Sequence, residues 1–138
     1  YLVDQGGKWS AQAANDYMAT ILPEYSEANG NMVELIICNN DGMAEGAVSA
    51  LQGAGYNTGD GKTIPVFGVD ATDSAKQLIN EGKMTGTIKQ DAEGMASTIL
   101  NLVSSVQGGG ELMDNTSSFN VDEGVAKIRV PYATYTGE

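Results

Sequence analysis

Polar side chains that could bind a small ligand follow directly after apolar runs at two places in this chain. Val33–Asp41, with the sequence VELIICNND, ends in two amides and a carboxylate, and Ile64–Asp70, with the sequence IPVFGVD, ends in a carboxylate. Each apolar run has the length of a strand, and a helical pattern begins just after it. Because the carboxyl ends of neighbouring parallel strands meet at one edge of an open sheet, these polar groups are expected to form a ligand site.

The residues at these two strand ends differ in their expected roles. We expect Asp41 to cap the following helix, which leaves the amide of Asn40 available to a ligand. An amide both donates and accepts hydrogen bonds, and so suits a neutral ligand rich in hydroxyl groups. Asp70 could also cap a helix, but Thr72 and Asp73 are better placed to do so. We therefore expect the Asp70 carboxylate to accept hydrogen bonds from ligand hydroxyls.

Three further residues belong to this candidate site. Gln90 follows the predicted strand Thr85–Lys89, although this position alone would not indicate a ligand contact. Trp9 is the single tryptophan; its indole either packs on the first turn of the next helix or stacks on the apolar face of a sugar ring. The polar groups at the strand ends favour stacking. Glu34, in an otherwise apolar strand, either faces solvent or supplies one carboxylate to a hard cation such as Ca²⁺, with the other ligands coming from elsewhere.

Strand-like and helix-like segments alternate along the chain, which predicts an α/β fold with a parallel sheet flanked by helices and right-handed crossovers. The helical patterns cover Ala11–Leu22, with Ser10 as its cap, then 43–51, 75–79 with Gly82 just past its end, and Asp91–Gln107. The expected strands are Tyr1–Asp4, Val33–Cys38, Ile64–Val69, Thr85–Lys89 and the last alternating segment, Val125–Tyr135. Pro131 in the last segment suits an edge strand or a crossing between domains.

Composition excludes several classes of function. The 138 residues include no histidine, so Ser-His-Asp and Cys-His catalysis and histidine-based metal sites cannot arise within the chain. Seven basic against eighteen acidic residues give a formal net charge of −11, which would repel a nucleic acid. Cys38 is the single cysteine, so no disulfide forms within the chain, and its apolar neighbours predict a buried thiol.

The sequence contains neither a phosphate-binding loop nor a membrane-spanning or signal-peptide segment. The glycine-rich stretch Gly53–Thr63 has Tyr56 where a phosphate-binding loop needs glycine, and it precedes a strand instead of following one. We expect it to be a surface loop. There is no run of eighteen apolar residues and no signal-peptide pattern at the start, so the chain is either cytoplasmic or has lost an upstream segment.

At these residues the chain resembles periplasmic-type sugar-binding proteins of ABC importers, in particular their glucose/galactose-binding branch. Five segments carry the resemblance, in order and at compatible spacing: Trp9-Ser-Ala-Gln-Ala-Ala, Asn39-Asn-Asp-Gly-Met-Ala-Glu-Gly-Ala, Ile64-Pro-Val-Phe-Gly-Val-Asp-Ala, Gly86-Thr-Ile-Lys-Gln-Asp and Arg129-Val-Pro-Tyr. The second segment also occurs in regulators of the lactose-repressor type.

The resemblance implies a role for each site residue. It makes Trp9 the aromatic that stacks on the sugar, Asn40 and Asp70 hydroxyl ligands, and Glu34 a calcium ligand whose partners lie in an upstream loop outside this chain. Gln90 stands where the glucose/galactose branch has asparagine, and a glutamine there is similar to ribose-binding relatives. The implied ligand is thus a monosaccharide, with glucose or galactose preferred to ribose, and the only implied cofactor is Ca²⁺ at Glu34.

The resemblance covers the C-terminal part of a two-lobed, type I periplasmic binding protein fold. It assigns residues 1–90 to most of the C-terminal lobe without its first strands, 91–122 to the N-terminal lobe, and 123–138 to a hinge crossing and return strand. Exposed strand edges make self-association of such a fragment an expectation. Closure around a ligand needs both lobes.

The function expected from this resemblance is capture of a monosaccharide, without catalysis, for a membrane permease of an ABC importer. The implied location is periplasmic or extracellular, with anchoring as a cell-surface lipoprotein as a variant. The alternative from another class is the effector-binding half of a sugar-responsive repressor. An enzyme ranks third, since histidine and a cofactor loop are both lacking.

Overall fold

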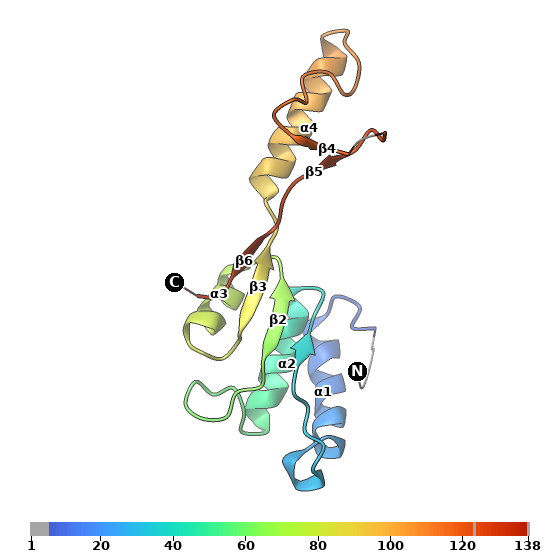
Figure 1. Ribbon diagram of the computed structural model, residues 1–138. Coiled ribbons are helices and arrows are strands. Elements are labelled where there is room, and N and C mark those ends of the chain that lie inside the picture. The colour runs from blue at the N-terminus through green and yellow to red at the C-terminus, as the bar shows by residue number, and fades with distance from the viewer. Residues whose placement is uncertain (1–5, 123, 138) are drawn as a thin grey trace. The chain divides into compact units, whose positions relative to one another are not determined.

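The computed structural model describes residues 6–122 and 124–137, so the expected first strand Tyr1–Asp4 lies outside the described residues (Figure 1). The chain forms two compact units. The first contains the described residues up to Lys89 together with those from Thr134 onward, and the second is Gln90–Ala133.

The first unit is built around a sheet of four strands in the order β1-β2-β3-β6. Strands β1, β2 and β3 run parallel, which confirms the predicted α/β class. The elements that contribute to this unit are α1 (Ala11–Glu24), the 3-10 turn η1 (Glu27–Asn29), β1 (Ile36–Ile37), α2 (Asp41–Gly53), β2 (Val66–Val69), α3 (Asp73–Asn80), β3 (Gly86–Lys89) and β6 (Ala133–Tyr135).

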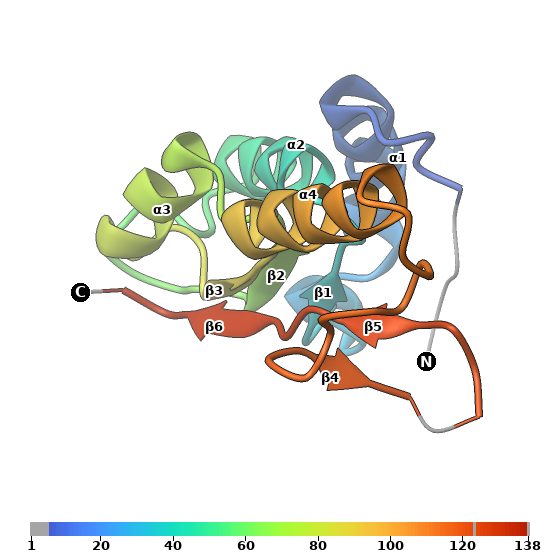
Figure 2. The same cartoon turned by 90° about the horizontal axis from the view of Figure 1, so that it is seen from above.

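Helices α1, α2 and α3 lie on one face of this sheet, as the two views together show (Figures 1 and 2). Helix α2 lies at the centre of the core, because its apolar residues recur at helical spacing and are almost fully buried. Strand β2 lies beneath it and alternates in burial, with Val66 and Gly68 buried and Phe67 and Val69 half-buried. The buried core residues are Met18, Leu22, Val33, Ala44, Ala47, Val48, Leu51, Ile64, Val66, Ala75, Ile79 and Met84.

The helix ends largely follow the predicted signals. The Ser10 hydroxyl accepts a hydrogen bond from the Ala13 backbone N–H and begins α1, and Thr72 does the same for Ala75 and α3. Gly82 follows α3 with a φ of 69°, as expected for a glycine just past a helix end. Helix α1 runs two residues beyond the predicted end, and its last turn contains Pro23, which has no backbone N–H to donate to the carbonyl four residues before it.

The strand predicted over Val33–Cys38 is too long. Only Ile36 and Ile37 form strand β1, at the end of the described sheet, and the residues just before them are exposed. An edge strand pairs with only one neighbour, and here the apolar stretch is longer than the part of it that pairs in the sheet.

The prediction that Gly53–Thr63 is simply a surface loop is wrong at one residue. Asn57 is fully buried with a φ of 51°. Its Nδ2 donates to the carbonyl oxygens of Ile64 and Lys83 at 2.8 and 3.0 Å, and its Oδ1 accepts from the Ile64 N–H at 2.9 Å. The loop is therefore tied to the chain on both sides of β2 by a single amide.

The second unit contains helix α4 (Ala92–Gln107) and an antiparallel pair of short strands, β4 (Asn120–Val121) and β5 (Ile128–Arg129). The Asp91 carboxylate caps α4 by accepting from the Gly94 N–H at 2.9 Å. The predicted last strand, Val125–Tyr135, is divided between β5 and β6, and Pro131 lies between them. In the described part of the chain, none of the helices is both long and apolar enough to span a membrane.

Candidate functional site

The strand register brings the two predicted strand ends to the same level of the sheet. Ile37 of β1 pairs with Phe67 of β2, so Asn40 and Asp70 each lie three residues beyond this pair. The strands point toward the end of the unit at which α1 and α2 begin (Figure 1). Ligand sites of open parallel sheets lie at this end.

The expected capping role of Asp41 is wrong, because Asn40 caps α2 instead. The Oδ1 of Asn40 accepts from the Met43 N–H at 2.9 Å. Since one amide atom is used inside the cap, the donor Nδ2 is the atom of Asn40 that suits a ligand oxygen.

Asp41 is the first residue of α2, and its side chain is fully buried. Its Oδ2 accepts from the Thr72 backbone N–H at 2.8 Å, and its Oδ1 accepts from the Thr87 hydroxyl at 2.6 Å. A carboxylate that receives two donors in a buried position is held more firmly than an exposed cap. Sequence reasoning gave Thr87 no role and expected Asp41 only as a helix cap, so it missed the hydrogen bond that joins the two residues.

Trp9 is on the surface, 69 % exposed, so its indole does not pack as a staple on α1. It lies in a turn closed by a hydrogen bond from the Ser10 N–H to the Gly7 carbonyl at 3.0 Å. Both central residues of the turn, Lys8 and Trp9, have positive φ angles of 50° and 60°. A Cβ at Gly7 would overlap the sulfur of Met43, so this turn lies against the first turn of α2, which Asn40 caps.

Asp70 also has an unusual backbone. It directly follows β2 with a φ of 117°, and the next residue, Ala71, has a φ of 56°. Among the described residues, four of the six non-glycine residues with positive φ thus lie in the turns that carry Trp9 and Asp70. Strained backbone of this kind persists where the surroundings fix it, and it clusters at functional sites.

The structure therefore brings Trp9, Asn40 and Asp70 to one end of the first unit, around the start of α2 and the carboxyl ends of β1 and β2. Gln90 directly follows β3 but belongs to the second unit. An exposed aromatic ring, an amide donor and a carboxylate can together bind a ligand with both an apolar face and hydroxyl groups.

Glu34 lies apart from these residues, at the amino end of β1, and is exposed. Among the described residues, no three His, Cys, Asp or Glu side chains are grouped so that they could hold a metal ion. Calcium takes six to eight oxygen ligands. Glu34 and its described neighbours therefore do not fit a complete calcium site, and the role predicted for Glu34 depends on ligands from outside this chain.

Cys38, just before the two asparagines, is half-buried, and burial raises the pKa of its thiol to about 11. A thiol of this kind is protonated at neutral pH and is a poor nucleophile.

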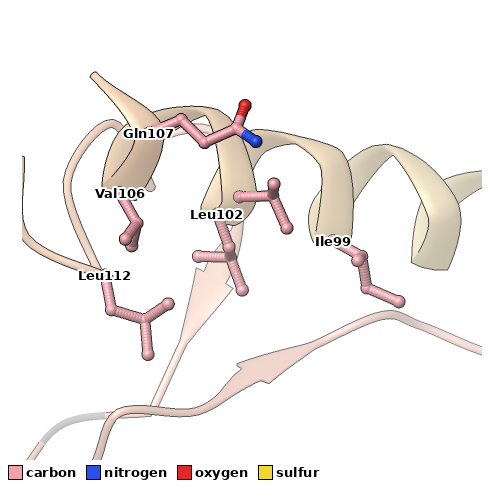
Figure 3. Close-up of a pocket in the computed structure, with 6 residues that line it drawn as sticks. Ile99, Leu102, Val106, Gln107 and Leu112 are labelled. Carbon is pink, nitrogen blue, oxygen red and sulfur yellow. The ribbon is translucent and has the colours of Figure 1, made fainter. Parts of the chain in front are cut away.

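A hollow of about 380 Å³ in the second unit has a different character (Figure 3). It is lined by α4 and the segment after it, with apolar side chains and one amide: Ile99, Leu102, Val103, Val106, Gln107 and Leu112. A lining of this composition offers little to the hydroxyl groups of a sugar.

Known proteins resemble the chain over most of its length. Residues 2–111 match a family described as periplasmic binding protein domain. The D-galactose/methyl-galactoside binding periplasmic protein MglB of Haemophilus influenzae is 34% identical over 126 residues, which is 91% of this chain and 34% of that protein. The chain thus spans about a third of the length of this relative.

Two solved structures show the same fold with different bound ligands. A periplasmic solute-binding protein from Actinobacillus succinogenes with bound D-allose is 29% identical, with a TM-score of 0.65 over 80% of this chain and 36% of that one. A solute-binding protein from Bacillus halodurans with bound myo-inositol is 27% identical, with a TM-score of 0.66 over 94% and 38%. Both are described as ABC transporter proteins. The family match, the relative and the shared fold agree, and the chain belongs to the periplasmic binding protein domain family.

Proposed function

We propose that this chain supplies one side of a monosaccharide site in a solute-binding protein of an ABC importer. The observation that carries this proposal is the arrangement of Trp9, Asn40 and Asp70 around the start of α2. The function is binding, and it involves no bond breaking.

Each of the three residues has a distinct task in this proposal. The exposed indole of Trp9 stacks on the apolar face of the sugar ring. The Asn40 Nδ2 donates to a sugar oxygen, because its Oδ1 caps α2. The Asp70 carboxylate accepts from sugar hydroxyls, and such charge-assisted hydrogen bonds are the strong ones. Gln90, which directly follows β3, is expected to add a further polar contact to the sugar.

We favour galactose or glucose as the sugar. The support is the 34% identity to a galactose-binding relative, while the structures with allose and myo-inositol indicate that this fold accepts several ring polyols. Galactose, glucose and allose share a hexose ring and its hydroxyl groups. The preference among these sugars therefore depends on the orientation of single hydroxyl groups.

In this proposal residues 91–122 belong to the other lobe of a two-lobed protein, and residues 123–138 form a hinge crossing and a return strand to the C-terminal lobe. The existence of two compact units supports this assignment. The partner is a membrane permease, and the location is periplasmic or extracellular. None of the relatives named above is a regulator, and so they give the repressor alternative no support.

Calorimetric titration of the natural full-length protein with galactose, glucose, allose, ribose and myo-inositol tests the proposal. Binding of at least one hexose in the micromolar range or tighter is expected, with ribose weaker. Absence of heat with every sugar at two temperatures would contradict the proposal. Two temperatures are needed because a binding enthalpy can pass through zero at one of them.

A further inference from the structure

We propose that Asp41 is a positioning residue, which fixes the backbone turn that presents Asp70 to the ligand. This inference rests on the proposed sugar site. It assigns to Asp41 a task different from that of its neighbour Asn40, although both residues lie at the start of α2.

The turn after β2 has three consecutive backbone N–H groups, and each has a defined acceptor. The N–H of Asp70 donates to the Ile88 carbonyl at 2.8 Å, that of Ala71 to the Thr87 hydroxyl at 3.3 Å, and that of Thr72 to the Asp41 carboxylate at 2.8 Å. Two of these three acceptors depend on Asp41, because the Thr87 hydroxyl in turn donates to Asp41 at 2.6 Å.

These bonds enclose the strained part of the chain. Asp70 and Ala71 have φ angles of 117° and 56°, which residues with a Cβ rarely adopt. Ala71 and Thr87 are buried, at 8 and 2 % exposed, so water is a poor substitute for the missing partner if one bond is lost. The turn therefore keeps its shape as long as Asp41 accepts from both sides.

The surroundings of Asp41 are shaped to admit its carboxylate. A Cβ at Gly68 of β2 would overlap the Asp41 Oδ1, so the strand offers space at the point where this oxygen meets Thr87. Helix α2, strand β3 and the turn after β2 thus meet at one side chain. A shift of the Asp41 side chain would therefore change the conformation of the turn after β2 and the orientation of Asp70.

The direction of these hydrogen bonds requires a carboxylate at position 41. Both partners of Asp41 donate to it, so each of its two oxygens must accept. An asparagine has one acceptor and one donor group on its side chain. In either orientation of the amide, Asp41→Asn sets a donor against Thr72 N–H or reverses the bond to Thr87.

The first test measures sugar affinity in the full-length protein by calorimetry at a temperature at which circular dichroism shows every variant to be folded. Asp41→Asn and Thr87→Val are expected to weaken binding at least about fivefold, because each leaves a buried donor without its partner. Thr87→Ser keeps the hydroxyl and should restore the affinity. Asp73→Asn, the same chemical change on an exposed side chain of α3, is the matched control.

A double-mutant cycle separates positioning from general destabilisation. If Asp41 acts through Asp70, then Asp41→Asn in an Asp70→Asn background should cost about twofold or less, because the contact that it positions is already weakened. The same loss of affinity in both backgrounds, or an unchanged affinity in Asp41→Asn alone, overturns the proposal.

A second measurement remains informative if the protein binds none of the sugars. Three-bond couplings between the amide and α protons of Asp70 and Ala71 report their φ angles. We expect Asp41→Asn and Thr87→Val to change these couplings and Asp73→Asn to leave them unchanged. Couplings that persist in Asp41→Asn overturn the positioning role, whereas lack of sugar binding by the natural protein refutes only the proposed function.

Discussion

The carbonyl oxygen of Ala11 lies directly against the backbone of Gly46, where no side chain would fit. At this point the start of α1 meets the middle of α2, and these two helices form the most extensive contact between elements of the first unit. The Asn15 Nδ2 donates to the Gly46 carbonyl at 3.2 Å one turn further along α1. Because α1 begins directly after the turn that carries Trp9, this contact also determines where Trp9 lies.

Gly46→Ala should destabilise the protein although alanine is the better helix former. The new Cβ would overlap the Ala11 carbonyl, and overpacking against backbone costs about 1–3 kcal/mol, more than the ~1 kcal/mol gained from helix propensity. Urea unfolding measures the free-energy change. Gly53→Ala in the same helix, where a Cβ would meet nothing within 4 Å, is the matched control and should leave stability unchanged or slightly higher. Equal effects of both substitutions would contradict the close approach of α1 and α2.

Asn57→Ala should be among the most damaging polar substitutions of the first unit. It removes three hydrogen bonds to backbone groups, two buried and one part-buried, each worth about 1 kcal/mol, and leaves alanine in a left-handed conformation. We expect a loss of about 3 kcal/mol in the free energy of unfolding. Thr58→Ala, on an exposed neighbour, should cost far less. A loss below about 1 kcal/mol for Asn57→Ala would show that water replaces the amide.

Trp9→Ala should weaken sugar binding and leave stability nearly unchanged. The side chain is exposed, so its removal disturbs little of the core. Stacking contributes about 0.5–1.5 kcal/mol, which corresponds to roughly a two- to tenfold loss of affinity. Trp9→Phe keeps an aromatic face and should retain part of the affinity. If calorimetry gives the same affinity for Trp9→Ala and the natural protein, Trp9 does not stack on the sugar.

The reactivity of Cys38 should depend on pH in a way that its burial determines. The folded pKa of its thiol is about 11, above the usual ~8.5, because burial disfavours the thiolate. Alkylation by iodoacetamide should be slow at about pH 8 in the folded protein and fast in urea. The same pKa shift sets how the free energy of unfolding depends on pH. The stabilising contribution of the neutral Cys38 thiol is complete below about pH 8.5 and is lost as pH rises toward the folded pKa.

Cys38→Ser is the control for this measurement, since other groups also titrate in alkaline solution. The urea midpoint of the natural protein should fall more steeply above about pH 8.5 than that of Cys38→Ser. Equal slopes, or rapid alkylation of the folded protein near neutral pH, would mean that the thiol is accessible.

The elements of the first unit followed from local patterns, because the signals that begin and end them are local. Ser10 and Thr72 cap helices by bonds to residues three positions away, and Gly82 ends α3 through its own conformation. The parallel order of β1, β2 and β3 followed from the alternation of strands and helices. The length of β1 did not, because apolar composition says nothing about how many neighbours a strand has.

The errors at Asp41 and Asn57 have a common physical cause. Either Asn40 or Asp41 could cap α2 on residue type alone, and the choice depends on partners 31 and 46 positions away from Asp41. The amide of Asn57 likewise reaches Lys83, 26 positions along the chain. Polar residues that are buried by distant backbone cannot be recognised from the spacing of their neighbours. By contrast, the positions of Asp70 and Asn40 could be anticipated, since a strand end is a local feature.

Trp9 is the single tryptophan of the 138 residues, and it stands exposed in the turn beside the start of α2. These residues therefore carry one intrinsic fluorophore, at the place where we propose that the sugar binds, and no second indole among them masks its emission. In the free protein the emission should have the long wavelength of a hydrated indole. A shift to shorter wavelength on adding a sugar would report this contact directly, in a cuvette and without any label.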